Sequence, residues 1–255
     1  MKKILIVSLI GLIMVLALSP SELGETITDL PPIKILPADY NPYQSLYDEM
    51  LAPTVRISSA SGIGSGVVIS HRDTENTEKS IYILTANHVV GNNTSVTVTV
   101  YSYISNTQAS LCNLCAFVVV TDTNKDLALL RINPPVSPFV KGGLRGIYSA
   151  KLAPKDYTPY LFTPVWTVGC SLGLKPRPSF GHLCALGDSV ANYWEVSSPI
   201  LPGNSGGPVY DANTHEVIGI AVWVHTYQGQ LITTMAGVVP IQSIYEFLNE
   251  TTNGH

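Results

Sequence analysis

The feature that most constrains this chain is a serine set among glycines, in the stretch Leu201–Val209, which reads LPGNSGGPV. Glycine allows backbone angles that other residues avoid and lets a second backbone approach closely. A loop of this kind before an apolar strand can aim several N–H groups at the oxyanion of an acyl-transfer transition state. The expected oxyanion loop is Gly203, Asn204 and Ser205, with the amides of Gly203 and Ser205 as donors. Because serine alone is a weak nucleophile, the interpretation requires a histidine base and a carboxylate.

The chain contains both partners. His88 follows an apolar, β-rich run over 80–86, and Asp126 directly precedes the apolar run 127–132. Asp122 competes with Asp126, but it lies in the turn-like segment TDTNK. Taken singly, His88 is a surface histidine at a strand end and Asp126 a helix N-cap. Taken together in the order His88, Asp126, Ser205, they predict a catalytic triad of the chymotrypsin order.

Several segments carry a resemblance to trypsin-like (chymotrypsin-fold) serine peptidases, and most of all to the HtrA/Deg group. They are Gly64–Ile69, Leu84–Val90, Asp126–Leu130, Pro202–Pro208 and Ala236–Ile241. The likeness runs from about residue 44 to about residue 249. It implies a serine endopeptidase whose active site lies between two barrels. No room remains after residue 255 for the PDZ domain of many HtrA/Deg proteins, so PDZ-gated regulation is not expected.

The predicted fold class is all-β, with two antiparallel six-stranded barrels of chymotrypsin type and a short C-terminal helix. The predicted strands lie near 54–60, 66–70, 80–86, 95–104, 114–121, 127–132, 161–169, 180–187, 192–197, 207–211, 216–225 and 231–239. A helix is expected from about residue 42 to 50. The peptidase domain spans 42–255, with barrel one over about 53–133, barrel two over about 159–240 and the last helix over about 241–250.

The first residues read as an export element. A lysine pair and an apolar run make 1–19 a signal peptide or an N-terminal membrane anchor, and 20–41 an extended tether rich in proline. The protein is therefore expected to be exported, with membrane contact only through that anchor. Its net charge of −4 and the absence of a basic run argue against nucleic acid as a partner.

The substrate is expected to be an extended or unfolded polypeptide. Pro199 stands six residues before Ser205, where the trypsin type carries an aspartate at the base of its specificity pocket. An uncharged base argues against cleavage after Lys or Arg and favours a small or medium aliphatic residue. Asn204 likewise replaces the aspartate that pairs with a new N-terminus in digestive relatives, so no such activation is expected. The predicted substrate-binding residues are Ser198, Pro199, Ile200, Val222, Trp223, Val224 and Gly237.

Four cysteines are expected to form disulfides in an exported chain. The favoured pairs are Cys170–Cys184 and Cys112–Cys115, and the rival is two bridges between these pairs across the barrels. Zinc held by four thiolates ranks lower, because only one pair has the Cys-x-x-Cys spacing. No metal or other cofactor is expected. Two further hypotheses are a peptide-binding module on a peptidase scaffold and a thiol-redox or zinc protein.

Overall fold

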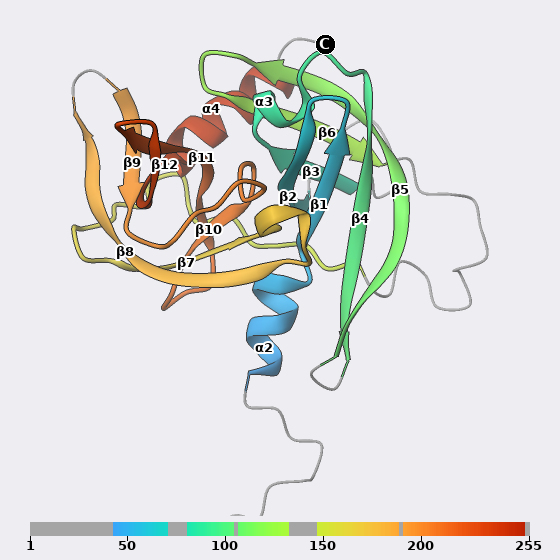
Figure 1. The fold of residues 1–255 in the computed structure, drawn as a ribbon, viewed down its shortest axis with the longest axis horizontal. Helices are drawn as coiled ribbons and strands as arrows, with labels where there is room; N and C mark the ends of the chain where they lie inside the picture. The colour runs from blue at the N-terminus through green and yellow to red at the C-terminus, as the bar shows by residue number, and fades with distance from the viewer. Residues whose placement is uncertain (1–42, 71–80, 105–106, 133–146, 189–190, 253–255) are drawn as a thin grey trace, which may run out of the picture. The chain divides into compact units, whose positions relative to one another are not determined.

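The computed structural model describes residues 43–70, 81–104, 107–132, 147–188 and 191–252, which form two closed antiparallel barrels (Figure 1). The predicted fold class is thus confirmed. The predicted export element and tether (1–41) lie outside the described residues, as does most of the first half of the connection between the barrels. Within the described part of the chain, no helix has the length and apolar character that a membrane crossing demands.

Barrel one follows from six apolar segments. Its strands are hydrogen-bonded in the order β1-β2-β3-β6-β5-β4, and β4 returns to β1. Their bounds are β1 Thr54–Ser59, β2 Gly62–Ser70, β3 Ile81–Thr85, β4 Ser95–Ile104, β5 Thr107–Asp122 and β6 Leu127–Ile132. Every residue of β3 and all but Arg131 in β6 are buried, because both faces of these strands are covered. Continuous apolar runs are typical of strands in that position.

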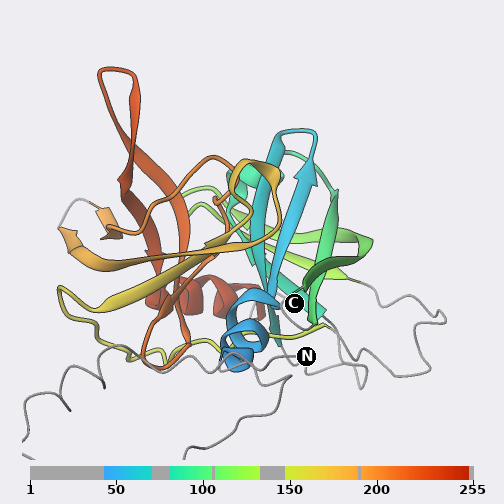
Figure 2. The same cartoon turned by 60° about the horizontal axis from the view of Figure 1, so that its bottom comes forward.

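Barrel two repeats the plan with the order β10-β11-β12-β9-β8-β7. Its strands are β7 Pro164–Gly169, β8 Arg177–Asp188, β9 Ala191–Val196, β10 Pro208–Asp211, β11 Val217–Tyr227 and β12 Gln230–Pro240. Strand β11 pairs with β10 only from Val217 to Ile220, whereas its pairing with β12 continues to Tyr227. The far part of β11 and β12 therefore projects as a long hairpin (Figure 2).

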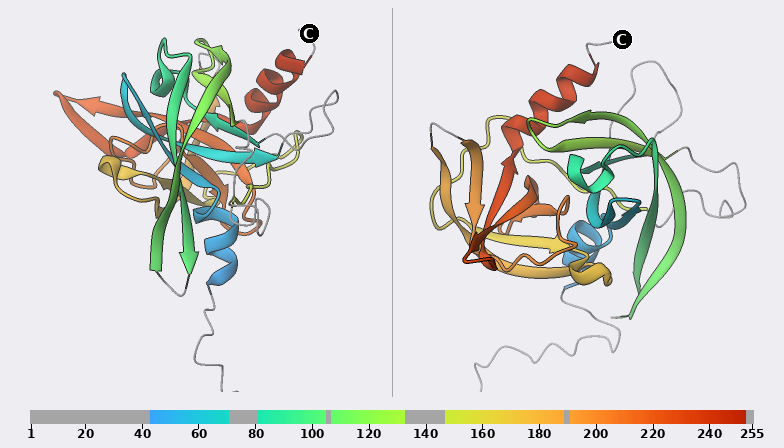
Figure 3. Two further views of the ribbon diagram at one scale, coloured as in Figure 1. Left: turned by 90° about the vertical axis from the view of Figure 1, so that its right-hand side faces the viewer. Right: turned by 45° about the horizontal axis from the view of Figure 1, so that its top comes forward.

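Four short or terminal helical segments complete the described chain. The predicted first helix is present, but as α2 (Gln44–Leu46) running into a π-helix over Tyr47–Leu51. Two short helices were not predicted: α3 (Asn87–Val90) and a 3₁₀ turn over Ser171–Gly173. The last helix, α4 (Ile241–Thr252), leaves the end of β12 as expected (Figure 3). It buries Ile241, Ile244, Phe247 and Leu248, which share one face of a helix.

The segment between the barrels ties them together. Ala150 forms a parallel bridge with Ile69 of β2, and Leu152 forms one with Val217 of β11. Helix α4 covers the same segment, since Tyr245 donates its hydroxyl to the Ala153 carbonyl at 3.1 Å. The two barrels thus share a continuous hydrogen-bonded connection beside their interface.

Candidate active site

His88 and Asp126 meet where β3 and β6 run side by side. Thr85 of β3 pairs with Ala128 of β6, so the residues that follow β3 lie next to those that precede β6. His88 Nδ1 lies 2.7 Å from Asp126 Oδ2, and the His88 backbone N–H donates to Asp126 Oδ1 at 2.9 Å. His88 follows the end of β3 and lies in the short helix α3, which the sequence did not predict.

The turn before β6 holds the Asp126 carboxylate next to α3. Asp126 has φ of +52°, a left-handed conformation that aspartate and asparagine tolerate better than most residues. Its backbone carbonyl accepts from the Asn87 N–H at 3.1 Å, which joins the turn to α3. Asp122 has a different task, because its Oδ1 accepts from the Asn124 and Lys125 N–H groups and thereby closes the turn. The structure therefore separates the two carboxylates that compete in the sequence.

Ser205 approaches α3 across strand β2. A Cβ added to Gly64 would lie 2.5 Å from a Val89 methyl carbon and 3.0 Å from the Ser205 carbonyl oxygen, so only glycine fits between the two segments. The Ser205 hydroxyl donates to the Val222 carbonyl at 3.5 Å, and no hydrogen bond to His88 is present among the described residues. Triad hydrogen bonds are often long in free enzymes and shorten when substrate binds.

The Pro202 and Asn204 carbonyls, which share peptide units with the Gly203 and Ser205 N–H groups, are both hydrogen-bonded. The Pro202 carbonyl accepts from the Leu172 N–H at 2.7 Å, and the Asn204 carbonyl accepts from the Gly207 N–H at 2.9 Å. In a trans peptide the N–H points opposite to the carbonyl. Each of the Gly203 and Ser205 N–H groups therefore points away from the group that its own peptide carbonyl contacts.

Those two N–H groups are left without a partner. The neighbouring Asn204 and Gly206 N–H groups donate to the carbonyls of Leu201 and Ala221, at 3.0 and 2.7 Å. Within the described ranges, Gly203 and Ser205 donate to no acceptor. Gly203 has φ of +97°, which favours glycine. Two adjacent free donors beside a serine hydroxyl are the arrangement that an oxyanion needs.

Asn204 is held inside barrel two by a neutral contact. It is 2% exposed, and its Oδ1 accepts the Ser171 hydroxyl at 2.6 Å. A Cβ on Gly169 would lie within 3.1 Å of three Asn204 atoms, so the side chain packs directly on the β7 backbone. The neutral Asn204 amide is thus satisfied by the Ser171 hydroxyl of the 3₁₀ turn. An aspartate at this position would need a charged partner instead.

Comparison with known proteins identifies the family of this chain. Residues 64–220 match the model of the trypsin-like peptidase domain. The chain belongs to this family. It is 28% identical over 204 residues to a DegP-like periplasmic serine endoprotease of Pseudomonas fluorescens, covering 78% of this chain and 37% of that protein. A DegP-like relative from Pseudomonas fulva is 31% identical over 179 residues, covering 68% of this chain and 32% of that protein.

The structural comparison agrees on the fold. A solved HtrA-type protease, AlgW with a tripeptide, superposes with a TM-score of 0.63 at 18% identity, covering 83% of this chain and 64% of that chain. The present chain spans about a third of the length of the curated relatives it matches. The resemblance expected from the motifs is thus confirmed for the peptidase domain.

The predicted specificity residues of this trypsin-like peptidase domain do not all face a cleft. Ser198 is fully buried and shares a 2.6 Å hydrogen bond with Thr167, and Ile200 is 3% exposed. Pro199 is exposed, and its carbonyl accepts the Ser179 hydroxyl at 2.9 Å. Of the three residues predicted at the pocket base, only Pro199 is therefore accessible to a ligand in this conformation.

Gly237, predicted on the facing pocket wall, lies against an aromatic ring. It pairs with Trp223, and a Cβ added to Gly237 would lie 1.9 Å from the indole Cε2. The indole ring thus covers the glycine. Trp223 also meets Tyr193 and His225 edge to face, with ring centroids 6.1 and 4.8 Å apart. This aromatic packing joins the β11–β12 hairpin to β9, and the sequence carries no signal for it.

The expected disulfides are corrected by the structure, in which all four cysteines are free. Cys112 and Cys115 lie three residues apart within β5, which puts their Cα atoms about 10 Å apart, too far for a bridge. Cys170 follows the end of β7 that pairs with Arg177, whereas Cys184 lies beyond the opposite end of the same ladder. Burial raises the pKa of the Cys170 thiol to about 12. No cluster of metal-ligating side chains occurs among the described residues.

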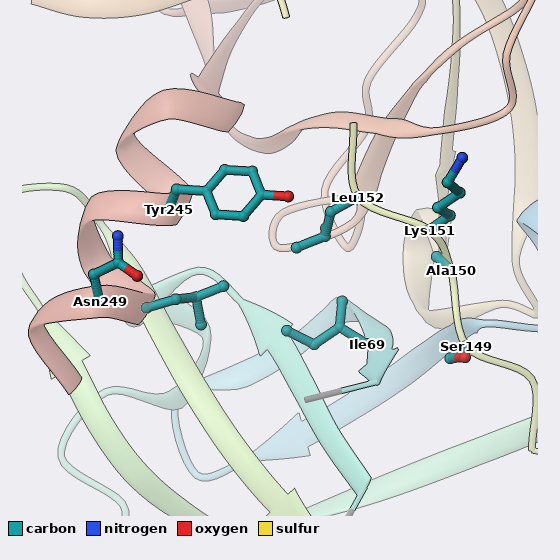
Figure 4. Close-up of a pocket in the computed structure, with 8 residues that line it drawn as sticks. Ile69, Ser149, Ala150, Lys151, Leu152, Tyr245 and Asn249 are labelled. Carbon is teal, nitrogen blue, oxygen red and sulfur yellow. The ribbon is translucent and has the colours of Figure 1, made fainter. Parts of the chain in front are cut away.

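A pocket of about 480 Å³ lies apart from these residues (Figure 4). It is lined by Ile69 of β2, the inter-barrel segment 149–152 and three residues of α4. Figure 4 shows the Tyr245 hydroxyl directed across it toward Leu152. None of the predicted site residues lines this pocket.

Proposed function

We propose that the chain is an exported serine endopeptidase that hydrolyses peptide bonds through an acyl-enzyme. The observation that carries the proposal is the pair of unpartnered N–H groups at Gly203 and Ser205, beside a hydrogen-bonded His88–Asp126 pair. A pair of free N–H groups, or a histidine bonded to a carboxylate, occurs in other proteins for purely structural reasons. Their meeting at one serine is what acyl-transfer chemistry requires.

The reaction follows from the roles of these groups. His88 Nε2 takes the Ser205 proton as the serine oxygen attacks the scissile carbonyl carbon. Asp126 accepts a hydrogen bond from the Nδ1–H of His88, which keeps Nε2 free as a base and stabilises the imidazolium. The oxyanion accepts hydrogen bonds from Gly203 and Ser205. His88 then protonates the leaving amine, and a water molecule attacks the acyl-enzyme in the same way to release the acid.

The substrate is proposed to be an extended polypeptide that pairs with the edge of β11. From Val222 to Tyr227 this strand pairs with β12, and no strand among the described residues pairs with its other edge. An extended segment can add to such an edge through backbone hydrogen bonds. Val222, Trp223 and Val224 are the positions nearest to Ser205 on this edge, since the Val222 carbonyl contacts the Ser205 hydroxyl.

A small or medium aliphatic residue before the cut is proposed because Pro199, the exposed residue at the predicted base, carries no charge. Export is proposed from the lysine-led apolar run in 1–19 and from the periplasmic location stated for the DegP-like relatives. The peptidase domain is proposed to span 42–255, with 20–41 as its tether.

The second candidate function is a peptide-binding module with an idle triad. The hydrogen bond from the Ser205 hydroxyl to Val222, in place of one to His88, is the observation in its favour. A module of this kind would bind peptides along β11 without reacting at Ser205.

Labelling with a fluorophosphonate probe separates the two functions. We expect the wild type to be labelled at Ser205, with Ser205→Ala and heat-unfolded wild type as controls that remain unlabelled. A folded wild type that binds unfolded casein but shows no labelling would overturn the peptidase proposal. Mass spectrometry of casein fragments would then report the residue before each cut.

A further inference from the structure

Ser65, in the middle of β2, is a buried polar residue that the proposed chemistry does not yet use. It is fully buried, yet it belongs to the apolar barrel that supplies His88 and Asp126 rather than to the one that supplies Ser205. A buried polar group is costly unless it is hydrogen-bonded. The partners of Ser65 therefore show what its hydroxyl does.

Among the described residues Ser65 forms four hydrogen bonds outside the strand ladder, and three of them cross to barrel two. The Ser65 hydroxyl donates to the Gly203 carbonyl at 2.7 Å and accepts from the Cys170 N–H at 2.8 Å. The Ser65 N–H donates to the Ser205 carbonyl at 2.8 Å. Only its own carbonyl bonds within barrel one, where it accepts the Thr85 hydroxyl at 2.6 Å.

The serine loop is pressed against this residue. A Cβ on Gly206 would lie 2.3 Å from the Ser65 carbonyl oxygen, and one on Gly207 would lie 3.2 Å from the Ser65 Cβ. The Cys170 backbone is equally close on the other side, since a Cβ on Gly203 would lie 2.5 Å from the Cys170 carbonyl oxygen. The Ser65 hydroxyl thus bridges two segments of barrel two that have no room to shift past each other.

The bridge fixes the peptide unit between the two oxyanion donors. Those donors belong to the peptides 202–203 and 204–205, and the peptide 203–204 lies between them. Its N–H is held by Leu201 and its carbonyl by Ser65. If that carbonyl were released, rotation of the peptide would turn the flanking N–H groups away from their common point.

We infer that Ser65 is a positioning residue for catalysis, whose hydroxyl keeps the Gly203 and Ser205 N–H groups aimed at the oxyanion. The inference rests on the proposed peptidase function. It also makes the orientation of the oxyanion loop depend on contact between the barrels, because the hydroxyl comes from barrel one and the loop from barrel two.

The test compares Ser65→Ala with Thr54→Val in the full chain. Thr54 lies on β1 of the same barrel, is fully buried, and donates its hydroxyl to the Met50 carbonyl at 2.8 Å, away from the serine loop. Each change removes one buried hydroxyl that donates to a carbonyl, and Ser65→Ala also leaves the Cys170 N–H without its acceptor, so its loss of melting temperature should be at least as large as that of Thr54→Val. The readout is the second-order rate of fluorophosphonate labelling, measured per labelled active site across pH 6–9.

We expect Ser65→Ala to label to full stoichiometry with a rate lowered about 10-fold to 100-fold, at most the loss caused by removing an oxyanion donor. The apparent pKa of the pH profile should stay unchanged, because His88 and Asp126 are untouched. Thr54→Val should label at the wild-type rate. A merely structural role would instead reduce the labelled fraction at an unchanged rate per site.

Ser65→Thr keeps the hydroxyl and should recover at least part of the rate if it folds. Should Ser65→Ala fail to fold, Ser65→Cys replaces it, since a thiol has a similar size but donates weakly. A wild-type rate in folded Ser65→Ala or Ser65→Cys would overturn the inference while leaving the peptidase proposal intact. An unlabelled wild type would instead remove the peptidase proposal itself.

Discussion

Replacement of Asp126 by asparagine tests the proposed triad most sharply, because the structure dictates how the new amide must lie. Asp126 Oδ1 accepts the His88 backbone N–H at 2.9 Å, and Oδ2 lies 2.7 Å from His88 Nδ1. In Asp126→Asn the amide oxygen has to remain on the backbone N–H, since an NH₂ group there would place two donors face to face. The amide NH₂ is therefore turned toward Nδ1.

The consequence is a histidine in the wrong tautomer. With a donor opposite it, Nδ1 must accept, so the imidazole proton moves to Nε2, where the base for Ser205 is needed. Such a change lowers turnover by about 10⁴-fold, which corresponds to about 5 kcal/mol of transition-state stabilisation. The fold should survive, because asparagine tolerates the φ of +52° at this position, whereas Asp126→Ala would add strain of about 1 kcal/mol.

Initial rates of casein hydrolysis and fluorophosphonate labelling at pH 7.5 measure the effect, with circular dichroism to confirm folding. The matched control is Asp122→Asn, four residues earlier, whose amide oxygen can still accept from Asn124 and Lys125. It should retain most of its activity. The reasoning is refuted if folded Asp126→Asn keeps more than about a tenth of the wild-type activity, or if Asp122→Asn loses as much.

Three further predictions follow from burial and backbone geometry. Asn204→Asp buries a carboxylate with one hydroxyl donor, so its melting temperature should fall at pH 8, and the deficit should shrink toward pH 5 as the carboxylate is protonated. An equal deficit at both pH values would contradict this. Gly203→Ala places a Cβ 2.5 Å from the Cys170 carbonyl, so activity should fall about 10²–10³-fold in folded protein; activity within about tenfold of wild type would contradict it. Iodoacetamide at pH 8 should modify the exposed Cys115 and Cys184 in native protein and the buried Cys170 only after unfolding, as peptide mapping would show.

Much of the fold could be read from local patterns in the sequence. Runs such as 127–132 and 95–104 appear in the structure with the predicted bounds, because apolar stretches bounded by turn residues can form little else than strands. Strand β5 begins at Thr107 rather than near 114, because its first half pairs with β4 although it carries no continuous apolar run. Short helices such as α3 depend on their neighbours and carry too few residues for a periodic signal.

The candidate site divides in the same way. The serine loop was evident because glycines and a hydroxyl stand next to one another in the chain. The hydrogen bond from Ser65 to Gly203 could not be predicted, because the two residues lie 138 positions apart in the sequence. The two predicted disulfides failed for a related reason. Closeness along the chain does not bring side chains together when an extended strand separates them or a hairpin places them at opposite ends.

The amino-acid sequence by itself determined where most of the strands lie and supplied the residue types of the proposed triad, since these follow from periodicity and from chemistry within short segments. The division of those strands into two barrels was implied by the resemblance to trypsin-like peptidases. Only the tertiary structure decided which peptide groups around Ser205 remain free, that Trp223 covers Gly237, and that barrel one holds the serine loop of barrel two. Those outcomes depend on register and packing between distant segments, which are settled when the barrels close against each other.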